Sequence, residues 1–246
     1  MSKKEIAITV NDLHVYYRDM KRFSIKRNGF KDKGSGKIFK AIKGVSFEIP
    51  KGQILGICGK NGSGKSTLLR AISGIFSPDH GSINLHGNSV SLLSIGVGFQ
   101  KQLTGYENIY LSGMLLGYTK EEIAKKVDEI IEFSELGDFI YRPVRSYSSG
   151  MYSKLAFSIT AILEADIILI DEVLSVGDIH FKEKSYNKMK ELISDETRTV
   201  VIVSHSTKTI VELCDRVIWL NDGLIKDDGD PKEIMAKYEE FMREEA

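Results

Sequence analysis

Residues 59–66 read G-K-N-G-S-G-K-S, an intact G-x-x-x-x-G-K-[ST] pattern, and this stretch decides the fold of the chain. The apolar run I-L-G-I-C at 54–58 precedes it, and L-L-R-A-I at 68–72 follows it. A strand, a glycine-rich loop and a helix are therefore predicted in the order that a phosphate-binding loop requires. Because the loop and both flanks agree, a nucleoside triphosphate site is a better interpretation than a glycine-rich turn that matches by chance.

The residue types of this loop suit phosphate. Glycine lets the backbone adopt positive φ angles and bring its N–H groups close to phosphate oxygens at the start of a helix. Lys65 supplies positive charge to the β and γ phosphates, and the Ser66 hydroxyl is placed to bind Mg²⁺. We expect the nucleotide to contact Gly59, Asn61, Gly62, Ser63, Gly64, Lys65, Ser66 and Thr67.

Composition bounds the class of protein. The 246 residues suit one large domain with a sizeable core. Lysine plus arginine and aspartate plus glutamate both number 34, so no net charge favours nucleic acid as a partner. Cys58 and Cys214 lie in apolar contexts and are expected to be reduced thiols. No apolar run approaches the roughly 20 residues of a membrane-spanning helix, and no signal peptide begins the chain, so we expect a soluble chain.

Before the loop, residues 6–17 and 45–49 alternate apolar and polar positions and are predicted as antiparallel strands. Between them, residues 18–37 form a basic insert that carries eight lysines and arginines against two aspartates. A solvated loop and a segment that contacts phospholipid head groups or an anionic substrate are equally good interpretations of this insert.

After the loop, P-D-H-G at 78–81 predicts a turn that leads into a strand at 82–85. Residues 107–163 have helical periodicity, which predicts a helical segment inserted into an α/β core. The apolar runs at 167–170 and 200–203 are typical of buried parallel strands, and the polar stretch between them predicts a helix, giving a βαβ unit.

Polar side chains follow both buried runs, at the sheet edge where such folds bind ligands. Asp171 is expected to hold Mg²⁺ through water and Glu172 to polarise an attacking water, as in P-loop ATPases. Without the phosphate loop upstream, a strand ending in a polar turn would be the better interpretation. His205 is placed to reach the γ-phosphate, with a core histidine as the usual alternative. The remaining histidines are expected to be structural or exposed: His14, His80, His86 and His180.

Residues 146–151 read S-Y-S-S-G-M and open a predicted helix. A hydroxyl, backbone N–H groups and the helix dipole converge there, which makes a second anion-binding device. Taken alone, an ordinary serine N-cap is the better interpretation of this stretch.

Together, these motifs resemble those of ATP-binding cassette (ABC) ATPases. Y-S-S-G-M at 147–151 is similar to their signature sequence, and Asp171 with Glu172 resembles their Walker B motif. S-V-G-D at 175–178 resembles the D-loop, His205 the switch histidine, and 215–223 the strand and turn that close the cassette. The resemblance implies ATP and Mg²⁺ as bound groups. It also implies one ABC nucleotide-binding domain over 1–246, a P-loop α/β fold with a parallel core sheet. The core and an antiparallel β subdomain together would comprise about 1–104 and 165–246, and an inserted helical subdomain about 105–164.

The resemblance also implies a dimer in which the nucleotide lies between two copies. One copy would supply the phosphate loop, and the other Ser148, Ser149 and Gly150. The catalytic residues implied are Lys65, Glu172 and His205, and the Mg²⁺ ligands are Ser66, Gln100 and Asp171, with Gln102 as second choice to Gln100. Tyr17 should stack on adenine, although the basic insert separates it from the loop, so Tyr16 or Phe39 is an alternative.

Within this family, Q-L-T-G-Y-E-N-I at 102–109 and D-E-V-L-S-V-G-D at 171–178 resemble the polysaccharide-export branch, and 131–140 with the basic insert are most similar to wall teichoic acid exporters. This implies an ATP-hydrolysing homodimer that powers export of a lipid-linked polymer, with O-antigen or capsule as the alternative cargo. It would bind an integral membrane permease through residues 90–116 at the cytoplasmic face, without nucleic acid. An ABC ATPase acting on nucleic acid or ribosomes is the rival from another class, and a non-hydrolysing sensor is disfavoured by Glu172 and His205.

Overall fold

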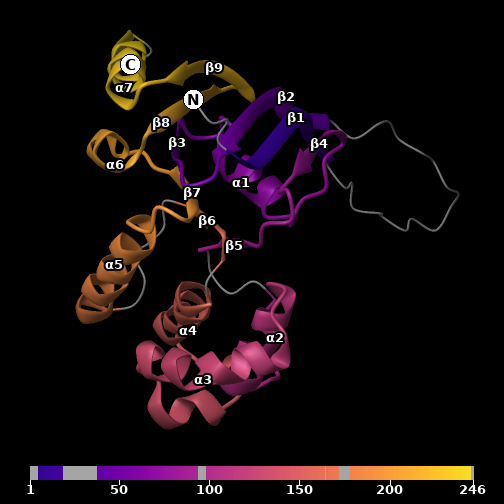
Figure 1. Cartoon of the computed structure of the whole chain (residues 1–246), viewed down its shortest axis with the longest axis vertical. Coiled ribbons are helices and arrows are strands. Elements are labelled where there is room, and N and C mark those ends of the chain that lie inside the picture. Colours follow the sequence, from indigo (N-terminus) through magenta and orange to yellow (C-terminus); the bar gives the residue numbers. More distant parts are fainter. Residues whose placement is uncertain (1–4, 19–37, 94–97, 164, 172–177, 245–246) are drawn as a thin grey trace, which may run out of the picture.

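The structure is a computed structural model, and it describes residues 5–18, 38–93, 98–163, 165–171 and 178–244. Figure 1 shows both sheets and helix α1 in the upper part of the molecule, with helices α2 to α4 grouped below them. Most of the basic insert, Glu172 and residues 175–177 lie outside the described residues. Expectations about those positions therefore stay predictions.

A six-stranded sheet forms the centre of the fold, in the order β5-β6-β7-β3-β8-β9. Its first five strands in this order are parallel, and β9 runs antiparallel to β8. In chain order the strands are β3 Ile54–Cys58, β5 Val90–Leu92, β6 Ile167–Ile170, β7 Thr199–Val203, β8 Arg216–Asn221 and β9 Leu224–Gly229. Because β6 and β7 are parallel neighbours joined through α5 (Ile179–Ile193), the predicted βαβ unit is confirmed.

Both faces of this sheet are buried, which explains why its strands read as continuous apolar runs. One face packs against α1 (Lys65–Ile72) and the second sheet through alternate residues such as Leu55, Ile57 and Val201. The opposite face packs against α5 through Ile168, Ile170, Val200 and Ile202. Farther along that face, Trp219 packs against α7 (Pro231–Glu244) and Ile210 of α6 (Thr207–Leu213).

The second sheet has the order β2-β1-β4 and is antiparallel, which confirms the prediction for the strands before the loop. Its strands are β1 Ile6–Arg18, β2 Ile38–Pro50 and β4 His80–Asn84. The predicted turn at 78–81 and strand at 82–85 are wrong by a few residues, because pairing with β1 extends the strand back to His80, which lies opposite His14. The amide of Asp79 already donates to the His14 carbonyl at 2.9 Å.

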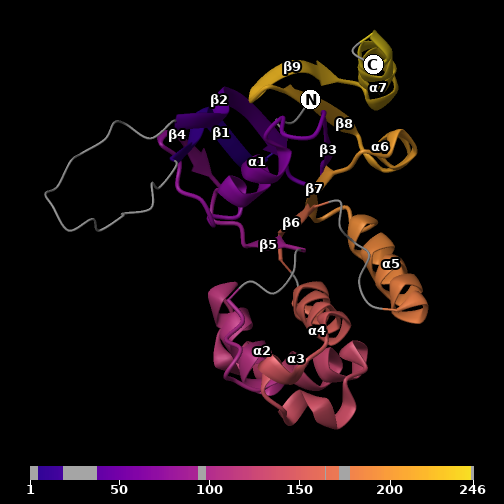
Figure 2. The ribbon, with the colours of Figure 1, turned by 180° about the vertical axis from the view of Figure 1, so that it is seen from behind.

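The lower part of the molecule consists of α2 Gly105–Leu115, α3 Lys120–Ser134 and α4 Ser149–Ile162, with two short 3₁₀ turns between α3 and α4. Thr104 and Thr119 begin α2 and α3 with capping boxes, in which the hydroxyl and a glutamate three residues later bond reciprocally to the backbone. These helices share a core of their own, which includes Ile109, Ile123 and Leu155. Figure 2 shows the same grouping from behind.

Cys58 and Cys214 are both free thiols. Within the described part of the chain, no helix has the length and apolar character that crossing a membrane demands.

Candidate functional site

The phosphate loop joins β3 to α1 and is shaped by glycines. Gly59, Gly62 and Gly64 have φ angles of 144°, 81° and 107°, a region that side chains disfavour. Gly64 is the N-cap of α1, and the Leu68 amide donates to the Gly64 carbonyl at 2.9 Å. The backbone therefore reverses sharply and enters the helix at Lys65, as a loop that wraps an anion at a helix N-terminus must.

Two of these glycines are also required by lack of space. A Cβ at Gly59 would lie 2.1 Å from the carbonyl oxygen of Leu220, and a Cβ at Gly64 would lie 2.6 Å from that of Ala41. A Cβ at Gly62 would meet no atom of the described residues within 4 Å. The loop is therefore packed against β8 and β2 on one side and open at Gly62.

Lys65 is buried beneath the loop, with 6% of its surface exposed. Its ammonium group donates to the carbonyl oxygens of Gly59 at 2.7 Å and Lys60 at 2.9 Å. These bonds hold the positive charge inside the curve of the loop. The charge is thus preorganised for an anion and does not depend on a mobile side chain.

Ser63 carries the observation that fits phosphate most directly. Its hydroxyl oxygen is fully buried and has no hydrogen-bond partner within the described structure. Leaving a buried hydroxyl unpaired costs about 1 to 3 kcal/mol, so such groups in native structures call for an explanation. A phosphate oxygen in the loop would give this hydroxyl an acceptor. The glycine backbone, the Lys65 ammonium and the Ser63 hydroxyl therefore fit a bound triphosphate.

The turn between β8 and β9 supports the loop from the side. The Gly223 amide donates to the Ser63 carbonyl at 3.0 Å, and the Gly223 carbonyl accepts from the Lys43 amide at 2.9 Å. A Cβ at Gly223 would lie 2.6 Å from the Ala41 carbonyl oxygen. The sequence analysis assigned no role to Gly223, although the N-D-G turn at 221–223 was a signal for a required glycine.

Three central strands end at the edge where the loop begins. Ile57 of β3 lies opposite Val203 of β7, and Ile170 of β6 lies opposite Ile202. Asp171 and His205 therefore follow strands that reach the same edge as the loop, and β7 lies between β3 and β6. Asp171 is partly buried and His205 is exposed. The fold brings these two predicted residues to the sheet edge at which the loop begins, and Glu172 lies outside the described residues.

The predicted metal ligands Ser66, Gln100 and Asp171 come from three elements. Across the described ranges, no group of three or more histidine, cysteine, aspartate or glutamate side chains gathers to hold a metal ion. The Gln100 amide donates to the side chain of Asn108 at 2.7 Å, while the Gln100 and Gln102 side chains are exposed. Asn108 is fully buried and also donates to the Gln100 and Thr104 carbonyls, so it shapes this segment. This role of Asn108 was not predicted from the sequence. The one feature that could have indicated it is the position of Asn108, one helical turn after the capping Thr104.

The three candidate aromatics for adenine differ in position. The Tyr17 hydroxyl lies 3.0 Å from the Thr67 hydroxyl oxygen on α1, and its ring contacts Phe76 edge-on at 5.8 Å. Phe39 lies opposite Tyr17 on β2, with ring centroids 6.5 Å apart. The Tyr16 hydroxyl instead bonds to His14 at 3.0 Å, on the other side of the strand. The geometry therefore favours Tyr17, with Phe39 beside it, over Tyr16.

The signature-like stretch lies apart from the loop of its own chain. Ser148 is the N-cap of α4, and its hydroxyl accepts from the Met151 amide at 3.2 Å. Ser148 and Ser149 are exposed. Because α4 lies in the lower part and α1 in the upper part (Figures 1 and 2), one chain does not bring Ser148, Ser149 and Gly150 to Lys65.

The Cys58 thiol lies beside the loop, and the four other histidines lie away from it. Burial raises the pKa of Cys58, directly before the loop, to about 12, although the nearby Lys65 charge acts in the opposite direction. This thiol is therefore neutral at physiological pH and adds no negative charge beside the loop. The histidines expected to be structural or exposed lie elsewhere: His14, His80 and His86 on or beside the β2-β1-β4 sheet, and His180 exposed on α5.

Known proteins match most of this chain. Residues 42–175 match the ABC transporter family. The chain is 49% identical to a teichoic acids export ATP-binding protein, TagH of Lactococcus lactis subsp. lactis (strain IL1403), over 84% of this chain and 44% of that protein. It is 42% identical to an O-antigen export system ATP-binding protein, RfbB of Klebsiella pneumoniae, over 84% of each. The chain spans less than half the length of some of the curated relatives it matches.

Solved structures agree on the fold. An ATP-binding cassette solved as a dimer, in a post-hydrolysis state with ADP and Pi, superposes with a TM-score of 0.69 over 91% of this chain and 98% of that one. Its sequence is 22% identical, so it speaks for the fold alone. The predicted fold class, a P-loop α/β nucleotide-binding domain, is confirmed.

The contrast between Gly59 and Gly62 is testable. Gly62→Ala should fold and lower the free energy of unfolding by about 1 to 2 kcal/mol, the cost of a left-handed backbone with a side chain. Gly59→Ala should cost about 3 kcal/mol or more, because its methyl group also overlaps the Leu220 carbonyl. Urea unfolding followed by circular dichroism measures both. Equal losses for the two variants would contradict the packing of the loop against β8.

Proposed function

Because the chain belongs to the ABC transporter family, we propose that it is the ATP-hydrolysing subunit of an exporter of lipid-linked cell-surface polysaccharide. The observation that carries this proposal is the phosphate loop, with the buried Lys65 held beneath it and the Ser63 hydroxyl lacking a partner in the described structure. Relatives named for teichoic acid export and O-antigen export support the cargo class. Teichoic acid is the first choice because it is the more frequent of the two names.

ATP would be held by the loop amides, the Lys65 ammonium and the Ser63 hydroxyl at the phosphates, and by Tyr17 at the adenine. The buried ammonium and the N-terminus of α1 offer fixed positive charge to the β and γ phosphate oxygens, between which negative charge is redistributed during transfer. Ser66, Asp171 and Gln100 would hold Mg²⁺, which neutralises charge on the β and γ phosphate oxygens when it is bound.

The residues that follow β6 and β7 would activate the attacking water. Glu172 would accept the proton of the attacking water, and His205 would hold the γ-phosphate. The position of Asp171 directly after β6, at the sheet edge where the loop begins, supports this assignment. His205 follows β7, which lies between the β6 and β3 strands.

A second copy of the chain would complete the site. Ser148, Ser149 and Gly150 are exposed or partly exposed at the start of α4, which lies in the lower part of the molecule, whereas α1 lies in the upper part. Two copies related by a two-fold axis would place the start of α4 of one copy over the loop of the other. ATP then acts as part of the interface, so that hydrolysis opens the dimer.

The exporter also needs a membrane partner. Residues 90–116 are the proposed contact with an integral membrane permease, and the exposed Met114 (41%) and Leu115 (60%) at the end of α2 support this. The chain would work as a peripheral subunit at the cytoplasmic face. Within it, we assign residues 105–164 to a helical subdomain and the remainder to the core and antiparallel subdomain of one nucleotide-binding domain.

The adenine contact is testable by aromatic replacement. Tyr17→Ala should weaken ATP binding about tenfold, since stacking on a base contributes about 1 to 3 kcal/mol. Tyr16→Ala is the matched control and should bind like the wild type, because its side chain faces the other side of β1. Titration with a fluorescent ATP analogue measures both. A loss in Phe39→Ala without a loss in Tyr17→Ala would transfer the role to Phe39.

Hydrolysis is testable through Glu172. Glu172→Gln should bind ATP normally, lose at least about 100-fold in turnover and accumulate as an ATP-bound dimer, because only proton acceptance is removed. Lys65→Ala should instead lose nucleotide affinity. Phosphate release and analytical ultracentrifugation with ATP measure these effects. Normal turnover by Glu172→Gln would exclude Glu172 as the base, and unchanged ATP affinity in Lys65→Ala would contradict the loop assignment.

The proposed role in export is testable by identifying the protein that co-purifies with an affinity-tagged form of this chain. Purification from detergent-solubilised membranes should recover an integral membrane protein in an equal ratio, because the dimer clamp has no cargo path of its own. Recovery with ribosomes or DNA instead would favour the rival function, in which ATP drives a clamp on nucleic acid. The equal numbers of acidic and basic residues argue against that rival.

A further inference from the structure

Four charged side chains from three helices meet beside α4, and we call them the three-helix ion cluster: Glu135, Lys154, Asp178 and Lys184. Lys154 of α4 lies at the centre, with its ammonium nitrogen 2.8 Å from an Asp178 carboxylate oxygen and 3.3 Å from Glu135. Lys184 of α5 approaches the other Glu135 oxygen at 2.9 Å. The Lys154 side chain is only 14% exposed, so these contacts are partly shielded from water.

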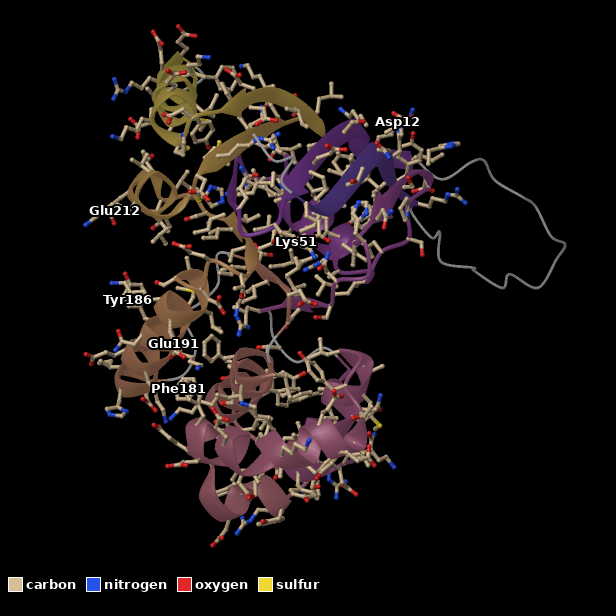
Figure 3. All side chains as sticks on the ribbon, in the orientation of Figure 1. Asp12, Lys51, Phe181, Tyr186, Glu191 and Glu212 are labelled. Atoms are coloured by element: carbon tan, nitrogen blue, oxygen red, sulfur yellow. The ribbon has the colours of Figure 1, made fainter. Side chains whose placement is uncertain are left out.

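An aromatic triangle lies under the cluster. Phe133, Phe157 and Phe181 come from α3, α4 and α5, with ring centroids 5.8 to 6.2 Å apart. The Lys154 ammonium lies 4.9 Å from the Phe181 centroid, and the Lys184 ammonium 4.6 Å from that of Phe133. Figure 3 labels Phe181 near the end of α5 that lies beside the lower helices. This apolar floor lowers the local dielectric constant and strengthens the ion pairs above it.

Both acidic residues of the cluster also stand at helix ends. Asp178 is the N-cap of α5, and one of its oxygens accepts from the Phe181 amide at 3.0 Å. Glu135 follows α3 with a positive φ of 56°, an uncommon conformation for a residue other than glycine. The bond from Lys154 holds the pKa of Asp178 at about 2, and Lys184 lowers the pKa of Glu135. Both acids are thus charged at neutral pH.

Lys154 is the member of the cluster that contacts all three helices. Without it, Glu135 keeps Lys184, and Asp178 keeps the Phe181 amide. Removing Lys154 therefore leaves no carboxylate without a partner, and the local fold has other support in the aromatic triangle. What is lost is the ion pair that joins the first turns of α4 to the N-cap of α5, while the Phe157–Phe181 contact remains.

The proposed function gives the start of α4 to the nucleotide of the other copy, and the start of α5 comes next in the chain after β6 and Asp171. Ser148 caps α4 and precedes Lys154 by less than two turns, and Asp178 ends the segment that follows Asp171. We propose that Lys154 is a positioning residue that makes the start of α4 and the start of α5 move as one unit. This inference rests on the proposed function for its effect on turnover, but the mechanical link is independent of ATP.

The link is tested by hydrogen exchange without nucleotide. Asp178→Asn removes the charge but keeps an N-cap oxygen, and it should speed exchange of amides 152–156 of α4 about tenfold. Lys154→Met should do the same for amides 182–186 of α5. Lys154→Arg keeps the charge and should restore wild-type rates. Lys188→Met is the matched control, since Lys188 pairs at 2.8 Å with Glu191 inside α5 and is similarly shielded. Changes confined to the mutated helix would overturn the inference.

The consequence is tested by kinetics in the same variants. Lys154→Met and Asp178→Asn should lower kcat about tenfold and weaken ATP-driven dimerisation, while KM and binding of a fluorescent ATP analogue stay within about twofold. Loss of ATP binding together with a lower Tm would mean a merely structural role and would overturn the proposal. If the wild type itself fails to hydrolyse ATP, the proposed function is wrong, and hydrogen exchange still decides the link.

Discussion

Close packing of the phosphate-loop backbone against two other strands is the constraint on which the rest of the structure depends. Gly59 fits against the Leu220 carbonyl of β8, and Gly64 fits against the Ala41 carbonyl of β2. The loop therefore keeps its shape only when both sheets are in place. This requirement explains why α1 and the apolar face of the central sheet share one core with the antiparallel sheet.

The two parts of the molecule carry different components of the proposed ATP site. The upper part holds a preorganised positive site, with the Lys65 ammonium fixed by the carbonyl groups of Gly59 and Lys60. The lower part presents an exposed, capped helix start at Ser148. Neither half is sufficient for the proposed chemistry in one chain, so the energetic link between the parts matters. Lys154 and the aromatic triangle lie at that link.

Much of the fold was predictable from the sequence because it follows local patterns. Continuous apolar runs predicted the buried parallel strands β6 and β7, and the glycine loop predicted the junction of β3 and α1. The start of β4 was wrong, because pairing with His14, far away in the chain, extends the strand through the expected turn. The supporting role of Gly223 was missed for the same reason, since it depends on backbone groups of Ser63 and Lys43, whereas the bonds of Asn108 are local but depend on the exact path of residues 100–104.

By itself, the sequence determined which residue types can bind a phosphate, since glycines, a lysine and a serine at fixed spacing act through their own neighbours in the chain. It also indicated the order of β3, α1, β6, α5 and β7 along the chain. Only the tertiary structure decided that Tyr17 faces α1 while Tyr16 faces away, and that Ser148 lies apart from its own loop. It alone brought Glu135, Lys154 and Asp178 together. The physical reason is that such contacts join residues distant in sequence, whose meeting depends on register and helix packing.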